Sequence, residues 1–355
     1  SMNSNLSIND AAEIIKIAID EAENTITKKF DKETKYGIPI GGGLDSTTLL
    51  AFMTRYIDRQ RLLPITLVNL GEYRYAKMVT EYLGLGLIEE YLDEDTFIEC
   101  LKRSFPLLQE PVAGIDIVPH TYFILSKLKN GGVNVVLTGD GGDEAFFGYP
   151  GMYKRAIRFK MLEPLPSLVL AKTYNLIENV ARSNYLLYSF FQAKIKPLYH
   201  AIAMKLQYEC YHSIEELLSA EYLKRYNIVA FDAHGIGRLR DINKAFNLTF
   251  LAPFLDRRFI EKLHSISAMH KQPSFSETKY SLRLMLLKEK LLPKDVVLLK
   301  RKMGFARGEL YFTKNLLKKY INLIFEYKNP YIDFRLLAKA IKLEDYYLLS
   351  AIVSF

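Results

Sequence analysis

The sequence predicts an α/β protein in which a doubly wound parallel sheet is joined to a helical second lobe. Three features support this fold class. Apolar segments of strand length alternate with amphipathic segments up to about residue 149, glycine-rich turns follow the first and fourth of the apolar segments, and the strand signal fades beyond that point. Strands that alternate with helices at such spacings are typical of parallel sheets with helical crossovers.

The expected helices and strands can be placed in order along the chain. Ser7 and Asp10 form a capping box in front of an amphipathic helix that continues to about residue 26. Strands are expected at residues 36–40, 64–69, 87–92 and 133–138, and helices at residues 44–56, 75–83, from about 96, and at 120–130. Pro39 has no backbone N–H to donate, which is unexpected in a central strand. Residues 150–355 are expected to be mainly helical.

The composition excludes several classes of protein. The 355 residues are 49% apolar, yet no apolar run reaches the roughly 18 residues of a membrane span, so no membrane partner is expected. The net charge of +8 comes from scattered basic residues, which favours a solvated basic surface with a nucleotide site over a nucleic-acid partner. Cys100 and Cys210 lack metal-ligand spacing, and so few cysteines fit the reducing cytoplasm. We therefore expect a cytoplasmic protein.

A glycine-rich turn follows the first expected strand. Gly41, Gly42 and Gly43 let the backbone turn tightly and direct successive N–H groups into one concavity, which the positive end of the next helix also faces. This arrangement suits a phosphate or pyrophosphate group, and the Ser46 hydroxyl can reach the same anion. Asp45 would be repelled by phosphates unless a cation such as Mg²⁺ lies between them. The alternative is a purely structural turn in which Asp45 caps the helix.

A second glycine-rich segment, with the acidic residues Asp140, Asp143 and Glu144, follows the fourth expected strand. Acids at the carboxyl end of a strand lie where open α/β sheets bind ligands. If the first and fourth strands are neighbours, Asp45 and Asp143 face each other and can share a magnesium ion with phosphate oxygens. The alternative is a polar loop whose acids interact with the dipole of the following helix.

Basic residues gather in two segments far downstream, at residues 278–283 and 300–305. Cations that precede a glycine suit a loop that reaches an anionic site, where they can neutralise charge on transferring phosphates or on an oxyanion. Taken alone, these residues are better explained by an exposed basic loop.

Five blocks of the sequence, in this order, resemble the synthetase domain of asparagine synthetases. Residues 42–46, GGLDS, are similar to the pyrophosphate loop SGGLDS of that family, and residues 138–149 are similar to its S-G-E-G-x-D-E-x-F-G-G-Y segment. Residues 253–256 match its P-F-L-D, residues 278–283 resemble T-K-x-x-L-R, and residues 300–305 resemble R-x-K-x-x-F. The resemblance implies an adenine nucleotide alpha-hydrolase-like fold that binds ATP and Mg²⁺.

The resemblance also implies a role for each matching position. For the base and ribose of ATP these positions are Ile40, Val68, Thr138 and Gly139, and for the pyrophosphate they are Gly41, Gly42, Gly43 and Ser46. The implied magnesium ligands are Asp45 and Asp143. The implied catalytic residues are Lys302, Asp140 and Glu144, with Lys302 stabilising the transition states of adenylation and amidation.

Four departures from the family pattern bear on the chemistry. Gly41 replaces a serine, so one hydroxyl contact to pyrophosphate is lost while the backbone N–H remains. Asp140 is one methylene shorter than the glutamate of the family, and Lys300 stands in place of an arginine that can make bidentate contacts. Because the sequence begins about 40 residues before the glycine-rich turn and shows no terminal cysteine nucleophile, we expect no N-terminal glutaminase domain. The nitrogen is therefore expected to come from ammonia, from an amine or from a separate glutaminase partner.

These observations predict an ATP-dependent amide-forming ligase that activates a carboxylate as an acyl-adenylate and releases AMP and pyrophosphate. The preferred hypothesis is an ammonia-dependent, asparagine-synthetase-like enzyme that acts on a small-molecule or peptide carboxylate. This hypothesis also allows a separate glutaminase or carrier protein as a partner. A β-lactam-synthetase-like or peptide-cyclising ligase is the first alternative. The second alternative is a nucleotide-binding partner subunit whose catalysis has decayed, against which the retention of Asp45, Asp143 and Lys302 argues.

The chain is expected to divide into three parts. Residues 1–32 would form an N-terminal helix that packs on the synthetase domain, residues 33–150 the ATP-binding α/β lobe, and residues 151–355 a mainly helical lobe that completes the active site. Substrate choice is expected to lie in the helical lobe, because a fold by itself does not determine a substrate.

Overall fold

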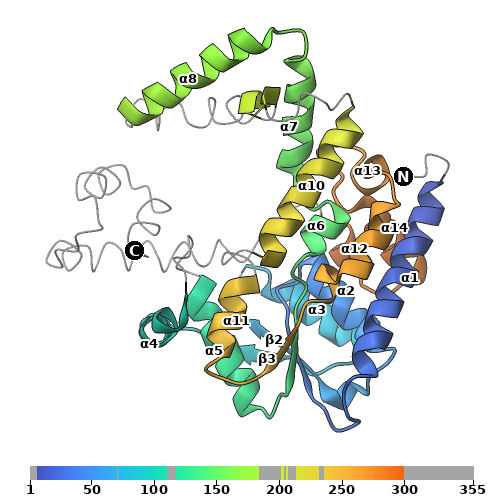
Figure 1. The fold of residues 1–355 in the computed structure, drawn as a ribbon. Coiled ribbons are helices and arrows are strands. Elements are labelled where there is room, and N and C mark those ends of the chain that lie inside the picture. Colours follow the sequence, from blue (N-terminus) through green and yellow to red (C-terminus); the bar gives the residue numbers. More distant parts are fainter. Residues whose placement is uncertain are drawn as a thin grey trace, which may run out of the picture.

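In the computed structural model, the described residues are 6–69, 71–109, 117–183, 201–203, 205–206, 213–231 and 236–299. Within them, five strands form one parallel sheet in the order β3-β2-β1-β4-β5, and helices lie on both of its faces (Figure 1). The strands are β1 (Tyr36–Pro39), β2 (Leu62–Leu67), β3 (Ile88–Glu90), β4 (Val135–Leu137) and β5 (Thr249–Leu251). The predicted α/β fold with a doubly wound parallel sheet is therefore confirmed.

The sequence predicts the first four strands close to their observed bounds, but it does not predict β5. This strand pairs with β4, with Val136 opposite Phe250, so a segment from the part expected to be helical completes the sheet. β5 has only three residues and none of them is buried, so neither length nor an apolar pattern distinguishes it from a loop. Its formation depends on β4, which lies far away in the sequence.

Pro39 is compatible with a central strand because of where its missing donor lies. On the β2 side, β1 pairs over its whole length, and the N–H of Ile40 donates to the carbonyl oxygen of Ile65 (2.9 Å). On the β4 side, the pairing extends only as far as Gly37 opposite Val136. Because successive N–H groups of a strand point to opposite neighbours, the Pro39 nitrogen faces the side where the ladder with β4 has already ended. No ladder hydrogen bond is lost.

Two apolar cores cover the two faces of the sheet. One core contains α1 (Ile8–Thr27), α2 (Leu44–Met53), α3 (Tyr73–Leu83), α12 (Arg257–His264) and α14 (Tyr280–Glu289), and the other contains α4 (Glu94–Ser104), α5 (Ile117–Asn130) and α11 (Arg238–Asn243). In Figure 1, α1 runs along the outer side of the molecule beside α14, with which it makes extensive contacts. The N-terminal helix is thus part of the first core.

The predicted capping box is present, and a glycine ends one of the predicted helices. The N–H of Asp10 donates to Oγ of Ser7 (3.2 Å), and the N–H of Ser7 donates to the Asp10 carboxylate (2.8 Å), which completes the capping box of α1. Gly84 ends α3 in the left-handed conformation, with φ 65°. Helix bounds differ from the expected ones by a few residues, as frayed ends commonly do.

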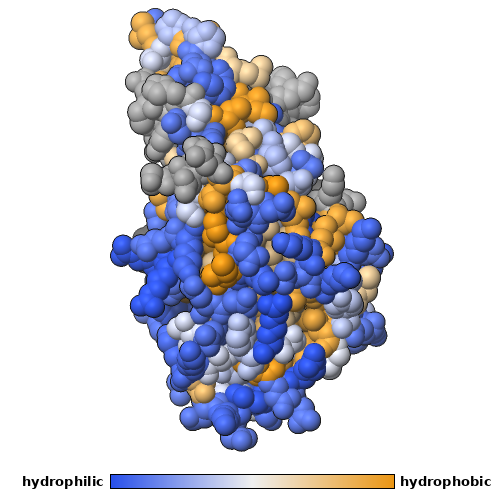
Figure 2. Space-filling model, turned by 90° about the vertical axis from the view of Figure 1, so that its right-hand side faces the viewer, coloured by the Kyte–Doolittle hydropathy of each residue, from blue (hydrophilic) through white to orange (hydrophobic). Residues whose placement is uncertain are grey.

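The remaining helices connect the sheet to a projecting arm. They are α6 (Gly142–Phe146), α7 (Pro150–Met161), α8 (Ser167–Ser183), α10 (Ile214–Phe231), α13 (Ala268–Lys271) and α15 (Lys294–Val297), with 3₁₀ helices at Arg59–Arg61, Phe105–Leu107 and Pro253–Leu255. In Figure 1, α7 and α8 extend away from the sheet, and α10 runs back toward it. Figure 2 shows a mostly hydrophilic lower surface interrupted by hydrophobic bands. Among the helices of the described residues, none combines the length and apolarity needed to cross a bilayer.

Glu23 is a buried acidic residue of α1. It has no solvent exposure, and neither carboxylate oxygen has a hydrogen-bond partner among the described residues. Burial raises the pKa of this carboxyl well above its ordinary value, and the nearby charge of Asp20 adds to the effect. Because the folded-state pKa exceeds the unfolded-state pKa, the free energy of unfolding decreases as the pH rises through the ordinary range of a glutamate toward the folded-state pKa.

Replacing Glu23 with methionine is expected to stabilise the protein. An apolar side chain of similar size removes a buried polar group without partners, whose cost is about 1–3 kcal/mol. Urea unfolding should show a larger gain near about pH 8 than near about pH 5, where less of the carboxyl is ionised. Glu13→Met, at an exposed position of the same helix, is the control and should change little. An equal gain at both pH values would contradict a raised folded-state pKa of Glu23.

Candidate functional site

The glycine-rich turn between β1 and α2 lies at the carboxyl edge of the sheet. Gly42 adopts φ +83°, and a Cβ at this position would lie 2.6 Å from Cβ of Tyr75 and 2.8 Å from the carbonyl oxygen of Glu72. Glycine is therefore required by both the backbone conformation and the close approach of α3. Gly43 is the N-cap of α2, and no side chain makes a capping hydrogen bond there. The first N–H groups of α2 can therefore serve an anion.

The loop after β4 packs directly on this turn. β1 and β4 are neighbours in the sheet, which is the condition under which Asp45 and the acids of residues 140–144 meet. A Cβ at Gly139 would lie 2.6 Å from the backbone nitrogen of Ser46, and a Cβ at Gly142 would overlap the carboxylate of Asp45. The two loops can therefore approach this closely only because glycine occupies these positions.

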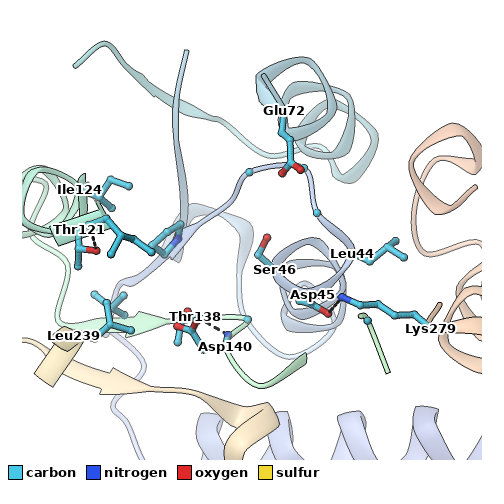
Figure 3. Close-up of a pocket in the computed structure, with 18 of the residues that line it drawn as sticks. Leu44, Asp45, Ser46, Glu72, Thr121, Ile124, Thr138, Asp140, Leu239 and Lys279 are labelled. Atoms are coloured by element: carbon cyan, nitrogen blue, oxygen red, sulfur yellow. Dashed lines mark hydrogen bonds and ion pairs between the residues drawn. The ribbon is translucent and has the colours of Figure 1, made fainter. Parts of the chain in front are cut away.

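Lys279 joins the two loops through a cluster of ion pairs. Its ammonium nitrogen lies 2.6 and 2.5 Å from the two carboxylate oxygens of Asp45, and 2.7 Å from Oδ1 of Asp143. Figure 3 shows the lysine reaching Asp45 across the end of α2. Burial opposes the charged form of Lys279, but the carboxylates of Asp143 and Asp45 outweigh it and raise the pKa to about 12. Lys279 therefore keeps its charge at physiological pH.

The backbone at Lys279 is fixed by its neighbours. Lys279 adopts φ 55°, in the left-handed region that is uncommon for a residue other than glycine. Its N–H donates to the carbonyl oxygen of Phe147 (3.2 Å), and Nε of Arg283 donates to the carbonyl oxygen of Thr278 (3.0 Å). A Cβ at Gly148 would lie 2.6 Å from Cε of Lys279. These contacts hold the lysine in place from the side opposite the glycine-rich turn.

A cavity of about 330 Å³ opens over the glycine-rich turn. At one end it is lined by the turn itself with Asp45, Ser46 and Lys279, and at the other by apolar side chains that include Ile124 of α5 and Leu239 of α11 (Figure 3). A cavity of this size with one polar and one apolar end suits a ligand that combines an anionic part with a flat apolar part. We call it the main cavity.

A second, acidic cavity of about 170 Å³ adjoins the main cavity. It is lined by Asp45, Asp140, Asp143, Glu144, Tyr149, Val229 and Arg238, together with Gly139 and Gly141. Asp140 and Arg238 line both cavities, so they mark the boundary between the two spaces. The hydroxyl of Thr138 donates to Oδ2 of Asp140 (2.6 Å), which fixes the orientation of this carboxylate at the boundary.

Glu144 is a buried carboxyl with a fixed partner. The hydroxyl of Tyr149 donates to Oε1 of Glu144 (2.6 Å), and Nε of Arg225 lies 3.7 Å from the same oxygen. Burial raises the pKa of Glu144, and the hydrogen bond from Tyr149 opposes part of that rise. The hydroxyl of Tyr222 accepts from the N–H of Tyr149 (2.8 Å) and lies 3.0 Å from Oε1 of Gln272. This network fixes the position of a carboxyl group whose proton affinity is raised by burial.

Most of the predicted site residues lie together around these cavities. Those that line the main cavity are Gly41, Gly42, Gly43, Asp45, Ser46, Thr138, Gly139 and Asp140, and those that line the acidic cavity include Asp143 and Glu144. Ile40 and Val68 line neither cavity, and their N–H groups donate within the sheet, to the carbonyl oxygens of Ile65 and Glu90. Lys302 lies outside the described residues.

Lys279, Tyr149 and Arg238 also belong to the site, and all three are absent from the predicted set. Lys279 belongs to a block that resembles the family, and Tyr149 ends another, so the sequence carries a signal for both. The sequence gives no signal for Arg238. Its place between the cavities depends on how α11 packs against α5.

The acids around Lys279 suit a divalent cation. Two carboxylates converge on a single positive group, and carboxylate oxygens are ligands that Mg²⁺ prefers. In the part of the chain that the structure describes, no group of three or more His, Cys, Asp and Glu side chains is arranged to hold a metal. An octahedral ion held by Asp45 and Asp143 would therefore complete its shell with phosphate oxygens and water.

The fold and the site together define the class of protein. A parallel sheet with a glycine-rich turn after β1 and an acidic, glycine-rich loop after the neighbouring β4 is the architecture of a nucleotide-binding α/β protein. The family model for asparagine synthase matches residues 20–345. The chain belongs to the asparagine synthase family.

Several curated proteins are similar to parts of this chain. A putative glutamine-hydrolysing asparagine synthetase 2 of Methanocaldococcus jannaschii is 29% identical over 161 residues, which cover 43% of this chain and 31% of that protein. A putative glutamine-hydrolysing asparagine synthetase of Mycobacterium tuberculosis is 29% identical over 148 residues, 41% of this chain and 22% of its own length. The glutamine-hydrolysing asparagine synthetase 2 of Oryza sativa subsp. japonica is 27% identical over 143 residues, 37% and 24% respectively. The matched segments span less than a third of each relative.

Gly148→Ala is expected to disrupt the site while leaving the fold intact. The added Cβ would overlap the Asp143 carboxylate and crowd Cε of Lys279. Overpacking of this kind costs about 1–3 kcal/mol, and where that cost falls on the geometry of the ion-pair cluster it lowers the affinity for Mg²⁺-ATP by roughly 5- to 150-fold. Equilibrium dialysis with labelled ATP measures it. Gly151→Ala is the matched control, because a Cβ at Gly151 meets no atom within 4 Å. Equal affinities for the two variants would show that the ion-pair cluster does not contribute to nucleotide binding.

Proposed function

We propose that this chain is an ATP-dependent amide-forming ligase that activates a carboxylate as an acyl-adenylate and transfers the acyl group to ammonia, releasing pyrophosphate and AMP. The observation that carries the proposal is the meeting of the glycine-rich turn, the acidic loop and Lys279 at one cation position between the main cavity and the acidic cavity. Membership of the asparagine synthase family supports the class of reaction.

The main cavity offers complementary surfaces to the two halves of ATP. Backbone N–H groups at the glycine-rich turn and at the start of α2 would bind the phosphates, with Ser46 donating its hydroxyl. The apolar end near Ile124 and Leu239 would receive the base. The buried positive charge of Lys279 lies at the phosphate end, where it favours a polyanion.

Asp45 and Asp143 are the residues that would hold Mg²⁺ in this site. When bound, the ion neutralises charge on the phosphates and makes pyrophosphate a better leaving group. The protein contributes the convergence of the two carboxylates, which depends on the close contact of the loops after β1 and β4.

The proposed reaction has two steps. In the first, a carboxylate oxygen of the substrate attacks the α-phosphorus of ATP, and the bond from that phosphorus to the bridging oxygen of the β-phosphate breaks, so pyrophosphate leaves. In the second, the lone pair of ammonia attacks the acyl carbon, the bond from that carbon to the AMP oxygen breaks, and the nitrogen loses a proton. Adenylation thus converts a poor leaving group into a good one, and an enclosed site protects the adenylate from water.

The acidic cavity suits the nitrogen side of this reaction. Its carboxylates attract ammonium, and one of them must accept a proton before or during attack. Burial raises the pKa of Glu144, which brings it toward the pH at which a general base is effective. Asp140, held by Thr138 at the boundary of the cavities, would orient the nitrogen toward the acyl carbon.

The products test the adenylation step. The chain is incubated with ATP labelled at the α-phosphate, Mg²⁺, ammonium and a panel of amino acid and peptide carboxylates. AMP and pyrophosphate should form in equal amounts, and hydroxylamine in place of ammonium should trap a hydroxamate. Asp45→Asn should form neither. ADP as the main nucleotide product would contradict the adenylate, and AMP formation with an amide product in the absence of ammonium would contradict the role of ammonia.

Lys302 is proposed to be catalytic on the resemblance of residues 300–305 to the family alone. Lys302→Ala should lower turnover about a hundredfold, because removing one preorganised donor to a charged transition state costs on the order of 3 kcal/mol. Its melting temperature and its affinity for ATP should stay close to wild type. Lys302→Arg should recover little activity, since a planar guanidinium cannot replace a point charge. Turnover above about a third of wild type at saturating ATP would exclude a catalytic role for Lys302.

A further inference from the structure

The two proposed magnesium ligands are already bridged by a cation that belongs to the chain. The ammonium nitrogen of Lys279 lies 2.5 Å from Oδ2 of Asp45 and 2.7 Å from Oδ1 of Asp143. We infer that Lys279 is an internal counter-ion that keeps a divalent cation from this position until a nucleotide in the main cavity draws the lysine away. This role rests on the proposed function, because it requires a nucleotide in that cavity.

The same carboxylate oxygens cannot serve both cations at once. Lys279 contacts both oxygens of Asp45 and one of Asp143. Mg²⁺ requires oxygens at about 2.0–2.1 Å in an octahedral arrangement, so its entry between the two acids requires that the ammonium group leave. Lys279 also lowers the formal charge of the cluster from −2 to −1, which weakens the attraction for a second cation.

Among the described residues, the neighbours of Lys279 leave the main cavity as the open direction for its side chain. Its backbone N–H is bound to the carbonyl oxygen of Phe147, and Gly148 packs so closely that an added Cβ would lie 2.6 Å from Cε of the lysine. Lys279 lines the main cavity, where the phosphates are proposed to lie, and it does not line the acidic cavity. The ammonium group of Lys279 can therefore leave the two carboxylates only by moving toward anions in the main cavity.

Binding of the nucleotide and of the metal is coupled by this exchange. A nucleotide without metal must pull Lys279 from two carboxylates, which leaves their charges exposed to each other. A metal without nucleotide must displace Lys279 into the main cavity, where no phosphate then compensates its charge. Each ligand therefore raises the affinity for the other by the same factor, as linkage requires.

Nucleotide-free binding of Mn²⁺, measured by the electron paramagnetic resonance signal of the free ion, tests this role. The wild-type chain should bind Mn²⁺ weakly, and Lys279→Met should bind it at least about tenfold more tightly, because the two carboxylates then lack their internal cation. Lys279→Met/Asp143→Asn should lose that gain. Lys271→Met is the matched control: Lys271 is also buried, but it lies over the ring of Phe147 (4.5 Å) rather than between acids, so its removal should leave Mn²⁺ binding as in wild type.

A second measurement uses the wild-type chain and does not depend on the folding of a variant. An ATP analogue with a methylene group between the α- and β-phosphates should increase the affinity of the wild-type chain for Mn²⁺ at least about tenfold, after correction for the Mn²⁺ that the analogue binds in a protein-free sample. Equal Mn²⁺ affinities with and without the analogue, or within about twofold for wild type and a folded Lys279→Met, would overturn the role of Lys279. Neither measurement involves turnover. A chain that shows the Mn²⁺ effects but forms no AMP would contradict the proposed reaction and leave the counter-ion role supported.

Discussion

The ammonium group of Lys279 joins three segments that are far apart in the sequence. The ammonium group binds Asp45 at the start of α2 and Asp143 at the start of α6. The residue Lys279 is also the N-cap of α14. The surrounding glycines follow from this cluster. Without glycine at position 142 a side chain would overlap Asp45, and without glycine at position 148 one would overlap Asp143. The composition of the loop after β4 therefore reflects the space that one buried lysine and two carboxylates need.

A layer of aromatic and apolar contacts supports this cluster from behind. Phe147, whose carbonyl oxygen binds Lys279, adopts φ 63° and stacks on Tyr222 of α10 with ring centroids 3.8 Å apart. Leu255 packs against Gly141 so closely that a Cβ there would lie 2.5 Å from Cδ2 of the leucine. The P-F-L-D block thus contacts the loop from outside the cavities. Blocks that resemble a family can act by holding a loop in place as well as by touching a ligand.

The sequence predicts those parts of the fold that depend on local signals. The capping box of Ser7 and Asp10 predicts the start of α1, and the apolar runs predict four of the five strands. β5 is not predicted, because its three partly exposed residues form a strand only when β4 lies beside them. The same limit applies to the site. Acids and glycines in tight turns can be recognised from the sequence. The residues around Lys279 do not indicate that its partners are Asp45 and Asp143. Ion pairs between distant segments are properties of the folded chain.

The two cavities divide the site between the sheet and the helical part. The loops after β1 and β4 supply the glycines and carboxylates, whereas α10 and α11 supply Val229 and Arg238 to the acidic cavity. A change at Val229 or Arg238 would reshape the acidic cavity while leaving Tyr222 of α10 stacked on Phe147. We therefore expect the sheet edge to determine the nucleotide chemistry, and the helices around Arg238, which lines both cavities, to determine which substrates meet the nucleotide.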